Sequence, residues 1–199
     1  MFSAKKNMPL KDYFEAITKE ILYNTDRYPD SATINESAGF SEQELSAIKD
    51  EQPILAFVYL FLVTKELQAR GKIASIRRSI PQEEVNRLIG EAFGYGLVVT
   101  LFKQVPTTIS QSDAADRAEA AGQQLLAHYS LYLDGIETGL GKPGDDPYFL
   151  GFEYFKSRVI EKAVLTNEKD FALLMLSKFI KNNLVKDLVE QITAVYKLI

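Results

Sequence analysis

Residues 54–63 read Ile-Leu-Ala-Phe-Val-Tyr-Leu-Phe-Leu-Val, ten apolar side chains in a row. A helix that spans a membrane needs about 20 such residues, so this run is too short to cross one. A helix that is apolar on every face is instead surrounded by other helices. Pro53 suits the first turn of a helix, and Gly71 suits the residue just beyond its end. The run therefore predicts a buried central helix over residues 53–70.

The chain on either side repeats apolar side chains at the three- and four-residue spacing of helices. After Pro9 this spacing gives a first helix with the stripe Leu10, Tyr13, Phe14, Ile17 and Ile21. Further helices are predicted from Ser41 to about Ile48, from Ser79 to before Pro106, from Ser110 or Ser112 to Gly135, from Asp146 through Ala163, from Asn167 through Ile180 and from Leu184 to Ile199. The last two can also be interpreted as one kinked helix. We predict an all-α, single-domain bundle of seven to eight helices with an apolar central helix, and the alternative is a weak subdivision near 104–111.

The clearest start of a helix lies at Ser41. Ser41 and Glu44 have the spacing of a capping box, in which each side chain accepts a hydrogen bond from the backbone of the other. Phe40 and Leu45 stand at the two positions of a hydrophobic staple around it. Asn167 is a further predicted cap, at the start of its own helix.

Composition and charge exclude several classes of protein. The 199 residues include no cysteine, which rules out disulfides, thiolate metal ligands and cysteine nucleophiles. The net charge is −4, and the basic cluster at 65–78 is too small to indicate nucleic-acid binding. Residues 1–10 are not followed by the apolar region of a secretory signal. We therefore expect an acidic, cytoplasmic protein that binds neither nucleic acid nor membranes.

No motif predicts a catalytic or metal site. His128, the only histidine, lies at the edge of an apolar stripe. There a boundary residue with one hydrogen bond is a plainer interpretation than a general base. The sequence 139–144 matches the pattern G-x-G-x-x-G, but a predicted helix precedes it and Asp145 and Asp146 follow it, where they would repel a phosphate. We expect no cofactor and no metal, and we favour a protein that is not an enzyme.

Aromatic side chains gather around the loop predicted between residues 135 and 147. Tyrosine combines apolar area with a polar tip, which suits a ligand pocket or a partner surface. Rings at helical spacing are also typical of a core, and both interpretations stay open. The predicted binding residues are His128, Tyr129, Tyr132, Asp134, Tyr148, Phe152 and Tyr154.

Three hypotheses of function follow from these patterns. The first is a non-catalytic protein-interaction module, such as an adaptor, a chaperone or a neutralising partner of another protein. The second is a small-molecule-binding helical domain, with an aromatic-lined pocket between the central helix and the region of Tyr132 and Tyr154. The third is an enzyme that uses carboxylates or His128. The apolar stripe over 184–199 packs within its own domain or forms a homodimer, and both alternatives remain open.

Overall fold

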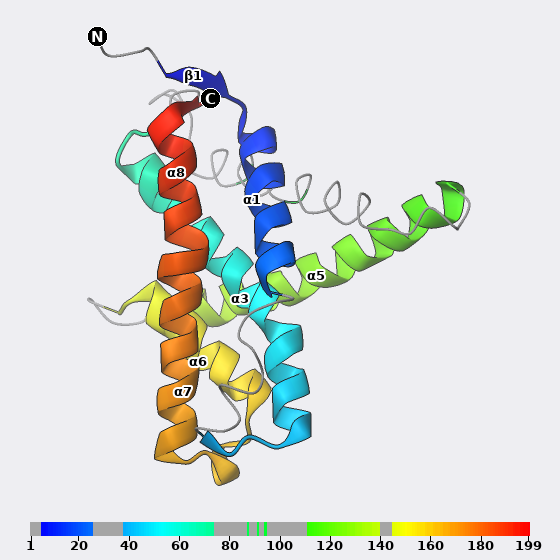
Figure 1. The fold of residues 1–199 in the computed structure, drawn as a ribbon, viewed down its shortest axis with the longest axis vertical. Coiled ribbons are helices and arrows are strands. Elements are labelled where there is room, and N and C mark those ends of the chain that lie inside the picture. Colours follow the sequence, from blue (N-terminus) through cyan, green and yellow to red (C-terminus); the bar gives the residue numbers. More distant parts are fainter. Residues whose placement is uncertain are drawn as a thin grey trace. The chain divides into compact units, whose positions relative to one another are not determined.

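The computed structural model describes residues 5–25, 38–73, 87, 91, 94, 111–139 and 145–199 (Figure 1). Most of these residues are helical, which confirms the all-α prediction. In this part of the chain no helix is both long and apolar enough to cross a membrane. The elements in chain order are β1 (Lys6–Met8), α1 (Leu10–Thr25), α3 (Glu42–Ala69), α5 (Gln111–Gly139), α6 (Pro147–Val159), the 3-10 helix η1 (Lys162–Val164), α7 (Asn167–Phe179), the π-helix η2 (Ile180–Lys186), α8 (Asp187–Val195) and β2 (Tyr196–Leu198).

The chain divides into two compact units. The first unit takes its described residues from 1–20, 63–127 and 187–199, and the second takes them from 21–62 and 128–186. The helices α1, α3 and α5 each contribute residues to both units. The subdivision predicted near 104–111 falls almost wholly outside the described residues, so the single domain stays a prediction.

The described residues form five continuous helices rather than the seven to eight predicted, because two predicted breaks are absent and the helix predicted over 79–105 lies mostly outside these residues. Pro53 lies inside α3, so the helices predicted over 41–48 and 53–70 are one. A proline inside a helix costs about 3 kcal/mol, which the burial of the residues that follow it can offset. The segments α7, η2 and α8 also follow one another without a break.

Two helix ends near α7 differ from the prediction. The cap of α7 is Thr166 rather than Asn167, because the backbone N–H of Lys169 donates to the Thr166 hydroxyl at 3.3 Å. The helix α6 ends at Val159, and Ala163 belongs to the short η1 that follows it. Thr166 and Asn167 are neighbours, and both have side chains that can accept a hydrogen bond from the first turn of a helix. The sequence alone does not show which of the two is the cap.

The core of the second unit is built around the apolar run of α3. Every residue from Ile54 to Leu60 is at most 2% exposed, as predicted for this run, whereas Phe61 and Leu62 are half-buried. The helices α6 and α7 both reach this run. The hydroxyl of Tyr59 donates to the backbone carbonyl of Tyr148 at 3.3 Å and shares a hydrogen bond with the hydroxyl of Ser177. Each large apolar side chain buried here contributes about 1.5–3 kcal/mol.

A short parallel strand pair joins the two ends of the described chain within the first unit. In this pair Lys6 lies opposite Tyr196, and Met8 lies opposite Leu198. The backbone N–H of Leu10 donates to the carbonyl of Ile199 at 3.0 Å and extends the connection into α1. The pairing places α1 beside α8 (Figure 1). The sequence did not predict these strands, because three residues are too few to show an alternating pattern.

The capping box predicted at Ser41 is present. The backbone N–H of Ser41 donates to Oε2 of Glu44 at 2.7 Å, and the backbone N–H of Glu44 donates to the Ser41 hydroxyl at 3.2 Å. These two bonds satisfy donors that the first turn of α3 would otherwise leave exposed.

Gly135 in α5 and Gly151 in α6 offer a matched test of packing in the second unit. Alanine in place of glycine inside a helix gains about 0.5–1 kcal/mol of stability. A β-carbon at Gly151 would meet Ile136 at an ordinary 3.5 Å, whereas one at Gly135 would lie only 2.9 Å from the ring of Tyr154. We expect Gly151→Ala to raise the free energy of unfolding and Gly135→Ala to lower it, as measured by urea denaturation. Effects of the same sign and size would contradict this packing.

Candidate functional site

The rings predicted as binding residues are mostly interior in the second unit. The structure buries Tyr129, Tyr132, Tyr148 and Phe152, leaves His128 and Tyr154 half-buried, and exposes Asp134. It brings Tyr132 and Tyr154 together in an edge-to-face contact, with ring centroids 4.6 Å apart. The ring of Tyr148 instead packs beside Tyr59 of α3, at 5.5 Å. A role of these residues in binding stays a prediction.

A buried carboxylate lies next to this aromatic pair. Glu51 accepts a hydrogen bond from the Tyr132 hydroxyl at 2.8 Å and another from Nε of Arg158 at 3.1 Å. Burial and then the Glu51 charge raise the pKa of Tyr132 well above its usual value, so the phenol stays protonated and donates. The sequence analysis missed Glu51 and Arg158. The available signal was the place of Glu51 between Ile48 and Leu55, on the apolar face of its helix.

A second ion pair in the second unit joins the start of α3 to α7. Nζ of Lys169 donates to both carboxylate oxygens of Glu44, at 2.8 and 2.9 Å. Burial alone would raise the pKa of Glu44, but the hydrogen bonds from Lys169 and Ser41 outweigh burial and lower that pKa. This pair and Arg158 line a cleft of about 520 Å³, together with Ser41, Gln43, Ala47, Ser157, Val159, Ile160, Glu161 and Val164.

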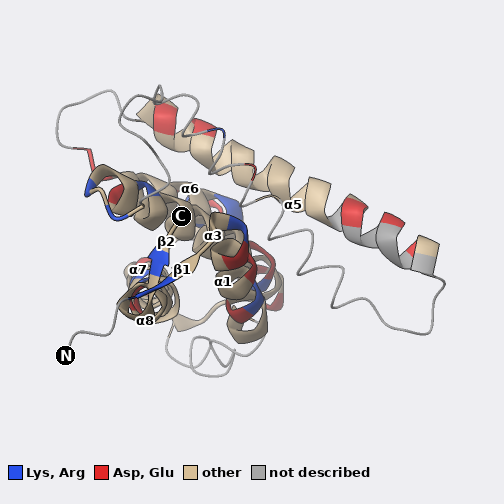
Figure 2. Ribbon diagram, turned by 90° about the horizontal axis from the view of Figure 1, so that it is seen from above, with Lys and Arg blue, Asp and Glu red and all other residues tan. Residues whose placement is uncertain are grey.

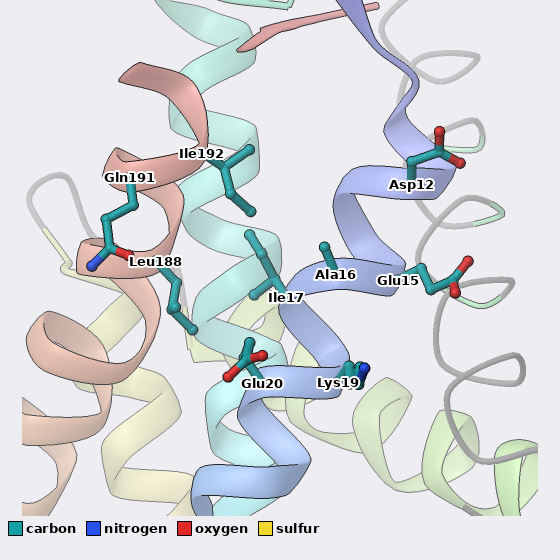
Figure 3. A pocket seen from close by; sticks show the side chains of 9 residues that line it. All are labelled: Asp12, Glu15, Ala16, Ile17, Lys19, Glu20, Leu188, Gln191 and Ile192. Atoms are coloured by element: carbon teal, nitrogen blue, oxygen red, sulfur yellow. The ribbon is translucent and has the colours of Figure 1, made fainter. Parts of the chain in front are cut away.

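The first unit contains a larger groove between α1 and α8, with a volume of about 690 Å³ (Figure 3). Its apolar floor comes from both helices. In Figure 3 the side chains of Leu188 and Ile192 of α8 extend toward Ile17 of α1, and Ala16 lies beside Ile17. We call this hollow the α1–α8 groove. Its position depends on the strand pair, which fixes α1 beside α8 at one end.

The α1 side of the α1–α8 groove is acidic. Among the described residues that line it, Asp12, Glu15 and Glu20 stand against one cation, Lys19. Figure 2 shows these acidic turns of α1 in red, and Figure 3 shows Asp12 and Glu15 on the side of α1 away from α8. The α8 side adds no charge, because its third lining residue is Gln191. The groove therefore combines an apolar floor with the carboxylate of Glu20 beside it, while Asp12 and Glu15 lie on the outer side of α1.

Metal ligands are not grouped among the described residues of either hollow. In the part of the chain that the structure describes, no three histidine or carboxylate side chains are grouped as ligands of a metal ion. Comparison with protein-family models, curated proteins and solved structures finds no match for this chain. Function must therefore be inferred from the shape and charge of the two hollows.

Removing the Tyr132 hydroxyl tests the buried Glu51 cluster. In Tyr132→Phe the Glu51 carboxylate keeps Arg158 but loses its other donor inside the core. We expect a loss of about 1–3 kcal/mol in the free energy of unfolding, the cost of a buried polar group without its partner. Tyr154→Phe is the matched control, since within the described residues the Tyr154 hydroxyl makes no hydrogen bond. Similar losses in both variants would contradict the role of Glu51.

We expect the Glu44–Lys169 pair to make the free energy of unfolding depend on pH in the acidic range. Because the pKa of Glu44 is lower in the folded than in the unfolded chain, the pair stabilises the fold above the unfolded pKa. This stability is lost as the pH falls through the lower, folded pKa. We expect the free energy of unfolding to fall less steeply below about pH 4.5 in Glu44→Gln than in the wild type. Urea denaturation at several pH values measures this slope, and the exposed Glu42→Gln serves as control; equal slopes for Glu44→Gln and wild type would contradict it.

Proposed function

We propose that this chain is a non-catalytic protein-interaction module whose α1–α8 groove holds a helix of a partner protein. The observation that carries the proposal is the partly exposed apolar floor of Ala16, Leu188 and Ile192, with the carboxylate of Glu20 beside it. Grooves between helices bind amphipathic helices, which insert apolar side chains spaced three or four residues apart. At about 1.5 Å per residue, the 16 residues of α1 extend over about 24 Å, enough to accompany four turns of a bound helix.

The charge of the groove selects the kind of helix that fits. Three carboxylates against one ammonium leave the lining with a net negative charge. In the part of the chain that the structure describes, Asp12 and Glu20 form no ion pair, so a partner can neutralise them. The complementary partner is a helix with lysine or arginine beside its apolar stripe. Such pairing favours association and weakens as the salt concentration rises.

A second exposed apolar surface also supports an interaction module. On α7, Phe171 is 64% exposed, Met175 is 49% exposed and Phe179 is 36% exposed, at a spacing of four residues. Exposed apolar stripes of this kind mark surfaces that bind other proteins.

The other predicted functions have less support. An aromatic small-molecule pocket was expected at Tyr132 and Tyr154; neither the α1–α8 groove nor the cleft at the start of α3 includes these residues, and such a pocket stays a prediction. The residues Leu188 and Ile192 of the C-terminal stripe face α1 of their own unit, and Leu198 pairs with β1. A homodimer through 184–199 stays a prediction.

Peptide binding to the full chain tests the proposal. The probes are two labelled peptides of 18 residues that carry the same apolar stripe, one flanked by lysine and the other by glutamate. We expect fluorescence anisotropy to show the lysine peptide binding at least tenfold more tightly, and the doubly reversed variant Asp12→Lys with Glu20→Lys to abolish this preference. The control Glu119→Lys with Glu137→Lys makes the same change in net charge at exposed positions of α5. Equal binding of the two peptides, or an equal loss in the control, would contradict the groove.

A further inference from the structure

The cleft at the start of α3 contains an arginine, Arg158, whose position is fixed by a hydrogen bond to the buried Glu51. Arg158 uses Nε to bind Glu51, and Glu51 is itself fixed by the Tyr132 hydroxyl. The Arg158 side chain is 44% exposed and lines the cleft. Within the described residues, its two terminal nitrogens make no hydrogen bond. Arginine offers a planar set of donors, so these nitrogens remain available to a carboxylate.

An ion pair in which Glu51 is buried while Arg158 stays 44% exposed suggests a role other than stability. Burying charges such as Glu51 costs free energy that the attraction to Arg158 only partly returns. By contrast, a side chain that is already fixed before binding loses less conformational entropy when the ligand binds, so the entropic cost of binding is smaller. The arrangement is therefore better suited to orienting the Arg158 guanidinium than to holding the fold together.

The charge in the cleft shows what kind of ligand would fit. Glu44 is neutralised by Lys169, and Glu51 is neutralised by Arg158. The remaining charge is Glu161, an exposed carboxylate on the same lining that, in the described part of the chain, forms no ion pair. A simple anion at Arg158 would leave Glu161 without a counter-charge, whereas a ligand with one carboxylate and one ammonium group would match both Arg158 and Glu161.

The rest of the lining adds apolar area of a suitable size. Val164 is 49% exposed although it is a large apolar side chain, and Ile160 and Ala47 line the same cleft. The backbone N–H of Val164 donates to the carbonyl of Glu161 at 3.0 Å, so one short turn carries both residues. The cleft volume of about 520 Å³ falls within the range of small-molecule sites, about 300–1,000 Å³.

We propose that this cleft binds a small zwitterion of the amino-acid class. Arg158 receives the carboxylate, Glu161 receives the ammonium group, and an aliphatic side chain rests on Val164. This site lies in the second unit and is independent of the α1–α8 groove.

Three matched probes test the site on the full chain. L-leucine carries both charges, 4-methylpentanoate carries only the carboxylate, and 3-methylbutylamine carries only the ammonium group. We expect amide NMR titrations to show saturable shifts at cleft residues with L-leucine, at an affinity at least tenfold higher than with either analogue. In Glu161→Gln we expect the affinity for L-leucine to fall to that of 4-methylpentanoate, with no change in Glu168→Gln, an exposed glutamate outside the cleft.

Arg158→Gln leaves Glu51 buried without its cation and can unfold the chain, so Arg158→Lys, checked for folding, is the second variant. We expect it to weaken L-leucine at least fivefold. The proposal is overturned if L-leucine does not saturate the cleft signals, if a singly charged analogue binds as tightly, or if both variants bind L-leucine as the wild type does.

Discussion

The complete burial of one continuous run of α3, from Ile54 to Leu60, is the constraint on which the second unit depends. A helix buried on all sides must be covered by neighbours on all sides, and α6 and α7 each supply part of that cover. The close approach of Gly151 to Val58 and Tyr59 shows how near α6 comes. The same burial explains why Pro53 does not end the helix. The apolar area gained after it exceeds the cost of one missing hydrogen bond.

The burial of α3 also determines which polar side chains of this unit need hydrogen-bond partners. Every polar group on the buried helix needs a partner, because an unpaired one would cost stability. Tyr59 finds Ser177, and Glu51 finds Tyr132 and Arg158. Of these partners Arg158 is partly exposed, and it lines the cleft at the start of α3. In the first unit the strand pair has the corresponding role, since it sets α1 beside α8 and so creates the groove.

Much of the fold follows from local sequence patterns, but the sites do not. The apolar run and the capping box at Ser41 are local signals, and both predictions are confirmed. Periodicity was less reliable on α7, which is apolar on two faces. Leu173 and Leu176 are buried while Phe171 is exposed, and spacing alone cannot choose between the faces.

The two hollows depend on contacts between distant parts of the chain. Arg158 and Glu51 are 107 residues apart, and the strands that align α1 with α8 lie at opposite ends of the described chain. No local pattern in a single sequence indicates such pairings. The aromatic cluster was visible in the sequence because its members are close together, yet most of its rings are part of the core.

Amide hydrogen exchange along α3 tests the central constraint most directly. If the run is enclosed on every side, the amides of residues 54–60 exchange only when the whole second unit unfolds, and their protection equals its free energy of unfolding. Exchange of these amides as fast as those of α8, whose residues are mostly exposed or half-buried, would contradict the account.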